Sequence, residues 1–162
     1  MATAANARVN VLKGLDEDEI SRLEAVCDVM TLSAGETVFS EGDEGDDLYI
    51  LRSGSVRISK AVSLTVDRTL ATLGTGGVFG ELAMVGEGTR SATAAAVEQS
   101  RVLILSREGF ESLVENEAVL GLKVMGRFAA ALADRLRLTT QLLTETVSWG
   151  LEVSGAARLD LQ

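Results

Sequence analysis

The spacing of glycine residues constrains the fold of this chain more than any other feature. Between residues 28 and 106, short segments that often alternate apolar and polar residues are separated by glycines. The separating residues are Gly35, Gly42, Gly45, Gly54, Gly74 and Gly76. The expected strands are 28–33, 37–40, 47–52, 55–62, 66–73, 77–79, 92–97 and 101–106. Short strands at this spacing predict an antiparallel β jelly-roll barrel.

Helical periodicity flanks the β-rich segment on both sides. Residues 16–27 form a predicted helix in which Asp16 caps the N-terminus and Glu19 completes a capping box. After the strands, residues 108–115 predict a short helix and residues 117–147 a long one. The expected fold class is α+β, a jelly roll flanked by N-terminal helices and a long C-terminal helix. The expected division is an N-terminal helical segment (1–27), the jelly roll (28–106), C-terminal helices (107–147) and a tail (148–162).

Charge and composition exclude several classes of function. A formal charge of −9 without a basic cluster argues against a nucleic-acid partner. The absence of histidine removes the commonest general base and metal ligand, so we expect neither an enzyme nor a metal site. The acidic loop 41–47 lacks the order of a calcium loop and is expected to be solvated. No apolar run is long enough for a membrane span, and the single Cys27 fits a reducing, cytoplasmic location.

The segment 79–93 carries the strongest functional signal. Gly80 permits close approach of backbone N–H groups, and the following residues can form a helical turn whose free N–H groups favour an anion. Arg90 offers a forked, permanently charged donor to phosphate oxygens. Glu81 is an acceptor suited to ribose hydroxyls. The segment therefore predicts a pocket for a compact sugar phosphate. The alternative is that Glu81 and Arg90 pair with each other or with other surface charges.

This segment resembles the phosphate-binding cassette of the cyclic-nucleotide-binding domains. Phe79-Gly80-Glu81-Leu82-Ala83 is similar to the first half of the cassette, and Arg90, Ala92 and Thr93 are similar to the second half. The resemblance implies that Glu81 holds the ribose 2′-hydroxyl and Arg90 the cyclic phosphate. It also implies that Ser91 and the amides near Leu82 and Ala83 complete the phosphate cradle. The candidate ligand-binding residues are Phe79, Gly80, Glu81, Leu82, Ala83, Arg90, Ser91, Ala92, Thr139 and Thr140.

The last two candidates come from the long helix. Its apolar residues recur at alternating steps of three and four, the spacing of a two-helix seam. The seam positions are Leu122, Met125, Ala129, Leu132, Leu136, Thr139, Leu143 and Thr146. We expect a homodimer through this helix, and the alternative is that the stripe packs on its own barrel. Residues 132–140 resemble the dimer helix of the catabolite activator proteins, in which a hydroxyl pair contacts the adenine base across the dimer, so the resemblance implies that Thr139 and Thr140 are base contacts. Alternatively, these threonines bond their own backbone.

The sequence thus predicts a stand-alone cyclic-nucleotide sensor. Its ligand is expected to be cAMP rather than cGMP, and its output an unidentified downstream protein. Two alternatives are the sensor domain of a DNA-binding regulator without its helix-turn-helix, and a degenerate docking or dimerisation module that no longer binds nucleotide. Trp149 is expected to pack on the barrel, the alternative being that it covers the nucleotide.

Overall fold

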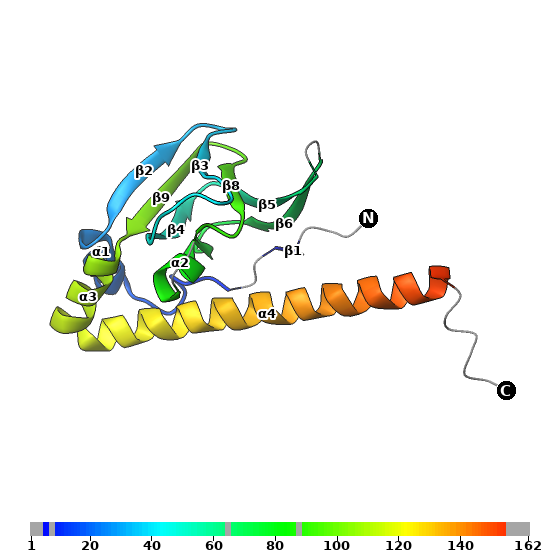
Figure 1. The fold of residues 1–162 in the computed structure, drawn as a ribbon. Helices are drawn as coiled ribbons and strands as arrows, with labels where there is room; N and C mark the ends of the chain where they lie inside the picture. The colour runs from blue at the N-terminus through cyan, green and yellow to red at the C-terminus, as the bar shows by residue number, and fades with distance from the viewer. Residues whose placement is uncertain (1–4, 7–8, 64–65, 87–88, 155–162) are drawn as a thin grey trace.

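The computed structural model describes residues 5–6, 9–63, 66–86 and 89–154, and places two β-sheets above a long helix (Figure 1). One sheet has the strand order β1-β6-β5-β8-β3 and the other β2-β9-β4-β7. Their strands are β1 (Ala5–Asn6), β2 (Asp28–Leu32), β3 (Thr37–Phe39), β4 (Leu48–Ser53), β5 (Val56–Ser63), β6 (Val66–Leu73), β7 (Val78–Phe79), β8 (Thr93–Ala96) and β9 (Ser100–Leu105). The strands from β2 to β9 confirm the predicted jelly roll, with end points that differ from the predicted ones by at most one residue.

The strand β1 is an addition to the prediction. It pairs in parallel with β6, Ala5 beside Ala71 and Asn6 beside Thr72, whereas the other pairings are antiparallel. A two-residue strand has too few positions to show an alternating pattern, and its pairing depends on a partner far along the chain.

The central strand β4 is covered on both faces. Leu48 and Ile50 belong to the core beneath the helices, while Tyr49 and Leu51 belong to the core between the sheets. Successive side chains of a strand point to opposite faces, so four consecutive buried residues require cover on both sides. This sheet therefore separates the core between the two sheets from the core beneath the helices.

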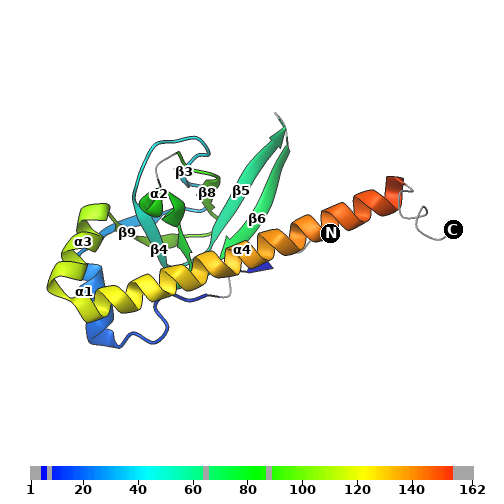
Figure 2. The same ribbon diagram turned by 60° about the horizontal axis from the view of Figure 1, so that its bottom comes forward.

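In the part of the chain that the structure describes, four helices accompany the sheets. Their bounds are α1 (Glu17–Ala25), α2 (Glu81–Val85), α3 (Arg107–Asn116) and α4 (Ala118–Ser154). Asp16 caps α1, and the predicted capping box with Glu19 is present. The first half of α4 runs along the barrel and its second half projects past it (Figures 1 and 2).

Two expectations about α4 need correction. The helix was expected to end at residue 147 and continues to Ser154, because no proline interrupts it and the one glycine in this added part, Gly150, costs only about 1 kcal/mol. Trp149 was expected to pack on the barrel, yet it lies on the projecting part of α4 and is 67% exposed. Neither the barrel nor a nucleotide site near it is covered by this side chain.

The seam predicted on α4 faces away from its own barrel. The residues that α4 buries against the barrel side are Leu120, Val124, Phe128 and Ala131. The seam residues Leu122, Met125, Leu136 and Leu143 are exposed instead. The alternative that the stripe packs on its own barrel is therefore wrong.

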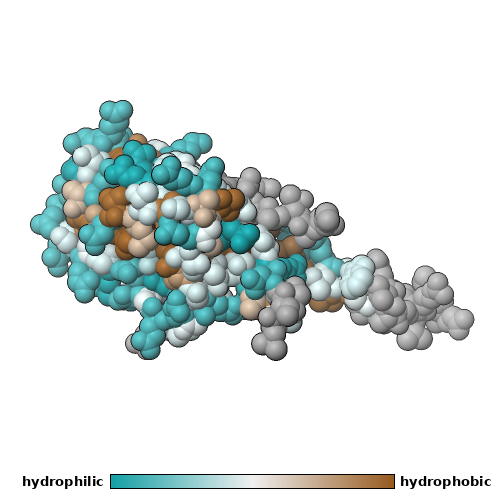
Figure 3. All heavy atoms as spheres, turned by 90° about the horizontal axis from the view of Figure 1, so that it is seen from above, coloured by the Kyte–Doolittle hydropathy of each residue, from teal (hydrophilic) through white to brown (hydrophobic). Residues whose placement is uncertain are grey.

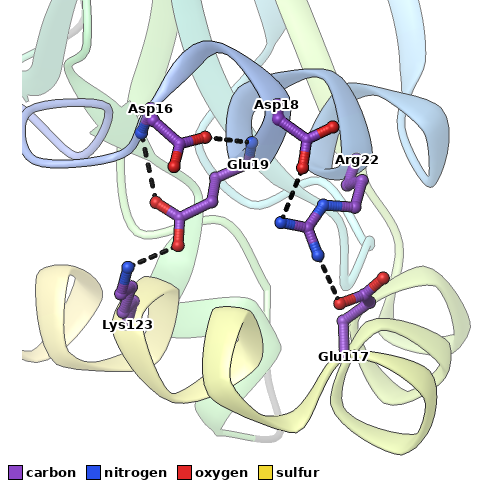
Figure 4. Close-up of polar contacts among 6 residues, drawn as sticks. All are labelled: Asp16, Asp18, Glu19, Arg22, Glu117 and Lys123. Atoms are coloured by element: carbon purple, nitrogen blue, oxygen red, sulfur yellow. Dashed lines mark hydrogen bonds and ion pairs between the residues drawn. The ribbon is translucent and has the colours of Figure 1, made fainter.

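Ion pairs fix α1 against the junction of α3 and α4 (Figure 4). Arg22 of α1 contacts Glu117, which lies between α3 and α4, at 2.6 Å, and Asp18 at 2.9 Å. Glu19 pairs with Lys123 of α4. The start of α4 is thus held to the N-terminal helix by charges as well as by the apolar core.

Cys27 follows α1 and is expected to be unreactive. Burial, together with the nearby charges of Glu24 and Asp28, raises the pKa of its thiol to about 12. The thiolate is the nucleophilic form. We therefore expect negligible modification by Ellman's reagent at pH 8 in the folded protein and full reaction in urea. Rapid reaction of the folded protein would contradict this environment.

Apolar and polar side chains are interspersed on the face seen in Figure 3. Within the described ranges, no helix is both long and apolar enough to cross a membrane. The same residues contain no group of three or more His, Cys, Asp or Glu side chains suited to a metal ion.

Candidate functional site

Arg90 points into the barrel and is almost completely buried, with 4% exposure. Its Nη1 donates to the carbonyl oxygens of Asp47 at 2.8 Å and Gly80 at 3.2 Å. Its guanidinium lies 4.5 Å from the centre of the Phe39 ring and 5.3 Å from that of Tyr49. Such cation–π contacts contribute about 0.5–2 kcal/mol each, depending on desolvation. These contacts hold the permanent positive charge of Arg90 at a fixed position within the cassette.

The aromatic platform beneath Arg90 is continuous with the barrel core. Phe79 stacks on Tyr49 with ring centres 5.2 Å apart, and Phe39 contacts both rings. Burial raises the pKa of the Tyr49 hydroxyl. Burial also raises the pKa of the Asp47 carboxyl, and the adjacent Asp46 charge adds to this, while Arg90 opposes it.

Two glycines flank the guanidinium of Arg90. A Cβ atom on Gly45 would lie 2.9 Å from Arg90 Nη2, and a Cβ atom on Gly80 would lie 2.8 Å from Nη1. Both glycines have positive φ, 149° for Gly45 and 77° for Gly80. A side chain at either position would be strained and would displace Arg90.

Replacing Gly45 with alanine should weaken anion binding at this site. The new methyl group forces Arg90 off its carbonyl acceptors, so ligand affinity should fall severalfold, in addition to about 1–2 kcal/mol of backbone strain. Gly35→Ala is the matched control, because Gly35 also has positive φ, at 86°, and open space around its Cβ position. Equal effects of the two variants on ligand affinity would show that the contact with Arg90 is unimportant.

Glu81 is also buried, with 1% exposure, and its partner comes from α4. Its Oε1 accepts from Arg135 Nη1, and Arg135 Nη2 donates to the carbonyl of Val78. The alternative expected that Glu81 pairs with Arg90 or with another charge, and its second form is observed for Glu81, whose partner is Arg135. This ion pair joins the cassette to the long helix.

Arg135 is a site residue that sequence reasoning missed. It stands four residues after the buried Ala131, in line with Val124 and Phe128, so helical spacing places it on the face of α4 that meets the barrel. The signal in the sequence was a charged residue at the same helical spacing as the apolar residues Val124, Phe128 and Ala131.

The remaining cassette residues differ in their exposure. Gly80 is the N-cap of α2, and as a glycine it offers no side-chain acceptor to the first-turn N–H groups of this helix. Leu82 is exposed on α2, and Ala83 lies in the same turn. Ser91 is exposed and Ala92 is buried. The structure therefore brings Phe79, Gly80, Glu81 and Arg90 together.

Thr139 and Thr140 lie farther along α4 and are exposed. The Thr140 hydroxyl donates to the carbonyl of Leu136 at 2.9 Å, as the backbone-bonding alternative expected. Among the hydrogen bonds of the described residues, neither threonine contacts the cassette.

The polar atoms left free suit a ligand with hydroxyl groups and a negative charge. Among described residues, three buried side-chain polar atoms lack a hydrogen-bond partner: Arg22 Nε, Glu81 Oε2 and Arg90 Nε. Two of the three belong to the cassette. A free carboxylate oxygen can accept a ribose hydroxyl, and a guanidinium can neutralise a phosphate.

Comparison with known proteins gives consistent matches. The profile of the family described as "Cyclic nucleotide-binding domain" matches residues 29–117, more than half of the chain. The cyclic AMP receptor protein of Thermus thermophilus is 42% identical over 103 residues, which are 64% of this chain and 46% of that protein. A CRP-like cAMP-activated global transcriptional regulator of Mycobacterium tuberculosis is 28% identical over 141 residues, 87% of this chain and 61% of that protein.

A solved structure shows that the similarity extends to the fold. The catabolite activator protein of Thermus thermophilus superposes with a TM-score of 0.72 at 34% identity, covering 86% of this chain and 63% of that one. The chain spans less than two thirds of the length of each of these three relatives. With the fold, the cassette and these matches in agreement, the chain belongs to the cyclic nucleotide-binding domain family.

Proposed function

We propose that this protein is a regulatory module that binds cAMP in preference to cGMP and catalyses no reaction. The observation that carries the proposal is the cassette itself, where a buried carboxylate and a buried guanidinium each keep one polar atom without a partner among the described residues. Arg90 neutralises the cyclic phosphate, and Glu81 accepts a hydrogen bond from the ribose. Two relatives are named as a cyclic AMP receptor protein and a cAMP-activated regulator, and this supports cAMP as the ligand.

The hydroxyl of Thr140 supports the preference for adenine. Because this hydroxyl donates to the Leu136 carbonyl, its oxygen presents only lone pairs to a ligand. Adenine carries an amino donor at the position where guanine carries a carbonyl acceptor. An acceptor at this position of α4 favours adenine over guanine at a nucleotide that contacts the helix.

The ion pair between Glu81 and Arg135 is the proposed route by which nucleotide binding affects α4. A nucleotide that binds Glu81 changes the environment of Arg135, which belongs to α4. A ligand shifts a conformational equilibrium only by its differential affinity for the two states. Because Glu81 already joins the cassette to α4, a nucleotide that contacts Glu81 binds with different affinity to states that differ in the position of α4. The helix then transmits the conformational change to a protein partner.

Thermal unfolding of nucleotide-stripped protein with cAMP, cGMP and 5′-AMP tests the proposal. A ligand at 100 times its Kd adds about 2.7 kcal/mol of stability, so cAMP should raise the Tm most and 5′-AMP least. Thr140→Val keeps the side-chain shape and should reduce the advantage of cAMP over cGMP. An unchanged Tm with millimolar amounts of all three would instead support a docking module that binds no nucleotide.

We also propose that the protein is a homodimer through α4. The support is the exposed seam, which includes Leu122 and Leu136, with 74% and 69% exposure. Sedimentation velocity should show a dimer for the wild type and a monomer for Leu136→Glu. Val62→Glu is the matched control, because it places the same charge on an exposed apolar residue of β5. A wild-type monomer at high concentration would refute the proposed dimer.

A further inference from the structure

The loop between β3 and β4 (residues 40–47) holds the backbone of Arg90 on both sides. The Arg90 N–H donates to the Asp43 carbonyl at 2.8 Å, and the Gly42 N–H donates to the Arg90 carbonyl at 2.8 Å. The same loop supplies the Asp47 carbonyl to the Arg90 side chain. The position of the guanidinium therefore depends on where this loop lies.

Glu41 attaches the start of this loop to two strands. Its N–H donates to Thr93 Oγ1 at 2.9 Å, and its Oε2 accepts from the Ala61 N–H at 3.2 Å. Its Oε1 lies 2.9 Å from Lys60 Nζ on β5. The hydrogen bonds from Lys60 and from the Ala61 N–H lower the pKa of the Glu41 carboxyl, so this carboxylate stays ionised at neutral pH.

Lys60 also reaches the residue after Arg90. Its Nζ donates to the carbonyl oxygen of Ser91 at 3.1 Å. In a trans peptide the C=O and the next N–H point in opposite directions. By holding the Ser91 carbonyl, Lys60 fixes the direction of the Ala92 N–H, an amide of the cassette segment itself.

We propose that Lys60, oriented by Glu41, is a positioning residue for the phosphate-binding segment 90–92, an inference that rests on the proposed function. One ammonium group joins this segment to the loop that encloses Arg90. The Lys60 and Glu41 side chains are 50% and 32% exposed, and an ion pair at this exposure adds little to folding stability. The function of the pair is therefore to order the site and not to stabilise the barrel.

Competition binding of cAMP to the whole chain tests this inference through Lys60→Met. Losing one hydrogen bond of ordinary strength should weaken cAMP binding about five- to tenfold, with the ligand-free Tm unchanged. Lys60→Arg retains the charge and the donors and should restore most of the affinity. Lys13→Met, which removes the charge of another exposed lysine, should bind as wild type does.

Measuring Lys60→Met in a second protein, the Arg90→Ala variant, distinguishes positioning of the Arg90 segment from a general effect of the Lys60 charge. If Lys60 acts through the Arg90 segment, Lys60→Met should weaken binding less in Arg90→Ala protein than in wild type. Equal losses in both backgrounds, or wild-type affinity in Lys60→Met, would overturn the inference.

Amide hydrogen exchange of the ligand-free protein keeps this inference separate from the proposed function. If the wild type binds no nucleotide, the proposed function fails, and exchange at residues 90–93 still measures positioning. Faster exchange there in Lys60→Met than in Lys13→Met supports a positioning residue, and equal exchange refutes it.

Discussion

Replacing Arg90 with alanine should weaken cyclic-nucleotide binding by about thirty- to several-thousandfold, equivalent to about 2–5 kcal/mol. The phosphate would enter a site whose buried positive charge is gone. The site has no histidine to replace it, since the chain contains none. Competition against a fluorescent cyclic-nucleotide analogue measures this loss directly.

Two controls separate the charge of Arg90 from its packing. Arg90→Lys keeps a charge but loses the forked donor and the broad contact with Phe39, so its affinity should fall between wild type and alanine. Arg101→Ala removes an exposed arginine on β9 and should leave binding unchanged. Wild-type affinity in Arg90→Ala would show that Arg90 is a structural residue only.

Replacing Arg135 with methionine should destabilise the folded protein by about 3 kcal/mol. This figure is the lower end of the range for breaking a buried ion pair, because the Arg135 side chain is itself one third exposed. The loss arises because the Glu81 carboxylate stays buried without a cation. Urea unfolding of the ligand-free protein measures it, and Arg137→Met on the exposed part of α4 is the matched control.

Glu81→Gln is expected to cost less than Arg135→Met. The Arg135 side chain is near the surface and can reach water after its partner is neutralised, whereas the Glu81 carboxylate cannot. The double variant should therefore be more stable than Arg135→Met alone. Additive losses in the double variant would contradict direct coupling between the two residues.

Short-range patterns were sufficient to predict most of the fold. Glycines with positive φ, such as Gly35 and Gly54, lie at turns between strands as predicted, because glycine alone adopts that geometry without strain. The Asp16 cap was equally local. The parallel strand β1 was missed since its partner is more than sixty residues away, as the pairing of Ala5 with Ala71 shows.

The candidate site was predictable in its members but not in their partners. The motif indicated Glu81 and Arg90, and the structure places both side chains in the cassette region and buries them. Their partners, Arg135 on α4 and the Phe39 ring on β3, come from segments that meet only after folding. Helical spacing indicates that Arg135 lies on the barrel-facing side of α4, but spacing within one segment does not identify the residue of another segment that it contacts.

Isothermal titration of cAMP into nucleotide-stripped wild-type protein tests the central claim most directly. The account predicts saturable heat with one nucleotide bound per chain, at a higher affinity than cGMP titrated under the same conditions. Absence of heat at several temperatures, together with no competition by either nucleotide, would contradict the claim and leave Glu81 and Arg90 as structural charges of a domain that no longer binds nucleotide.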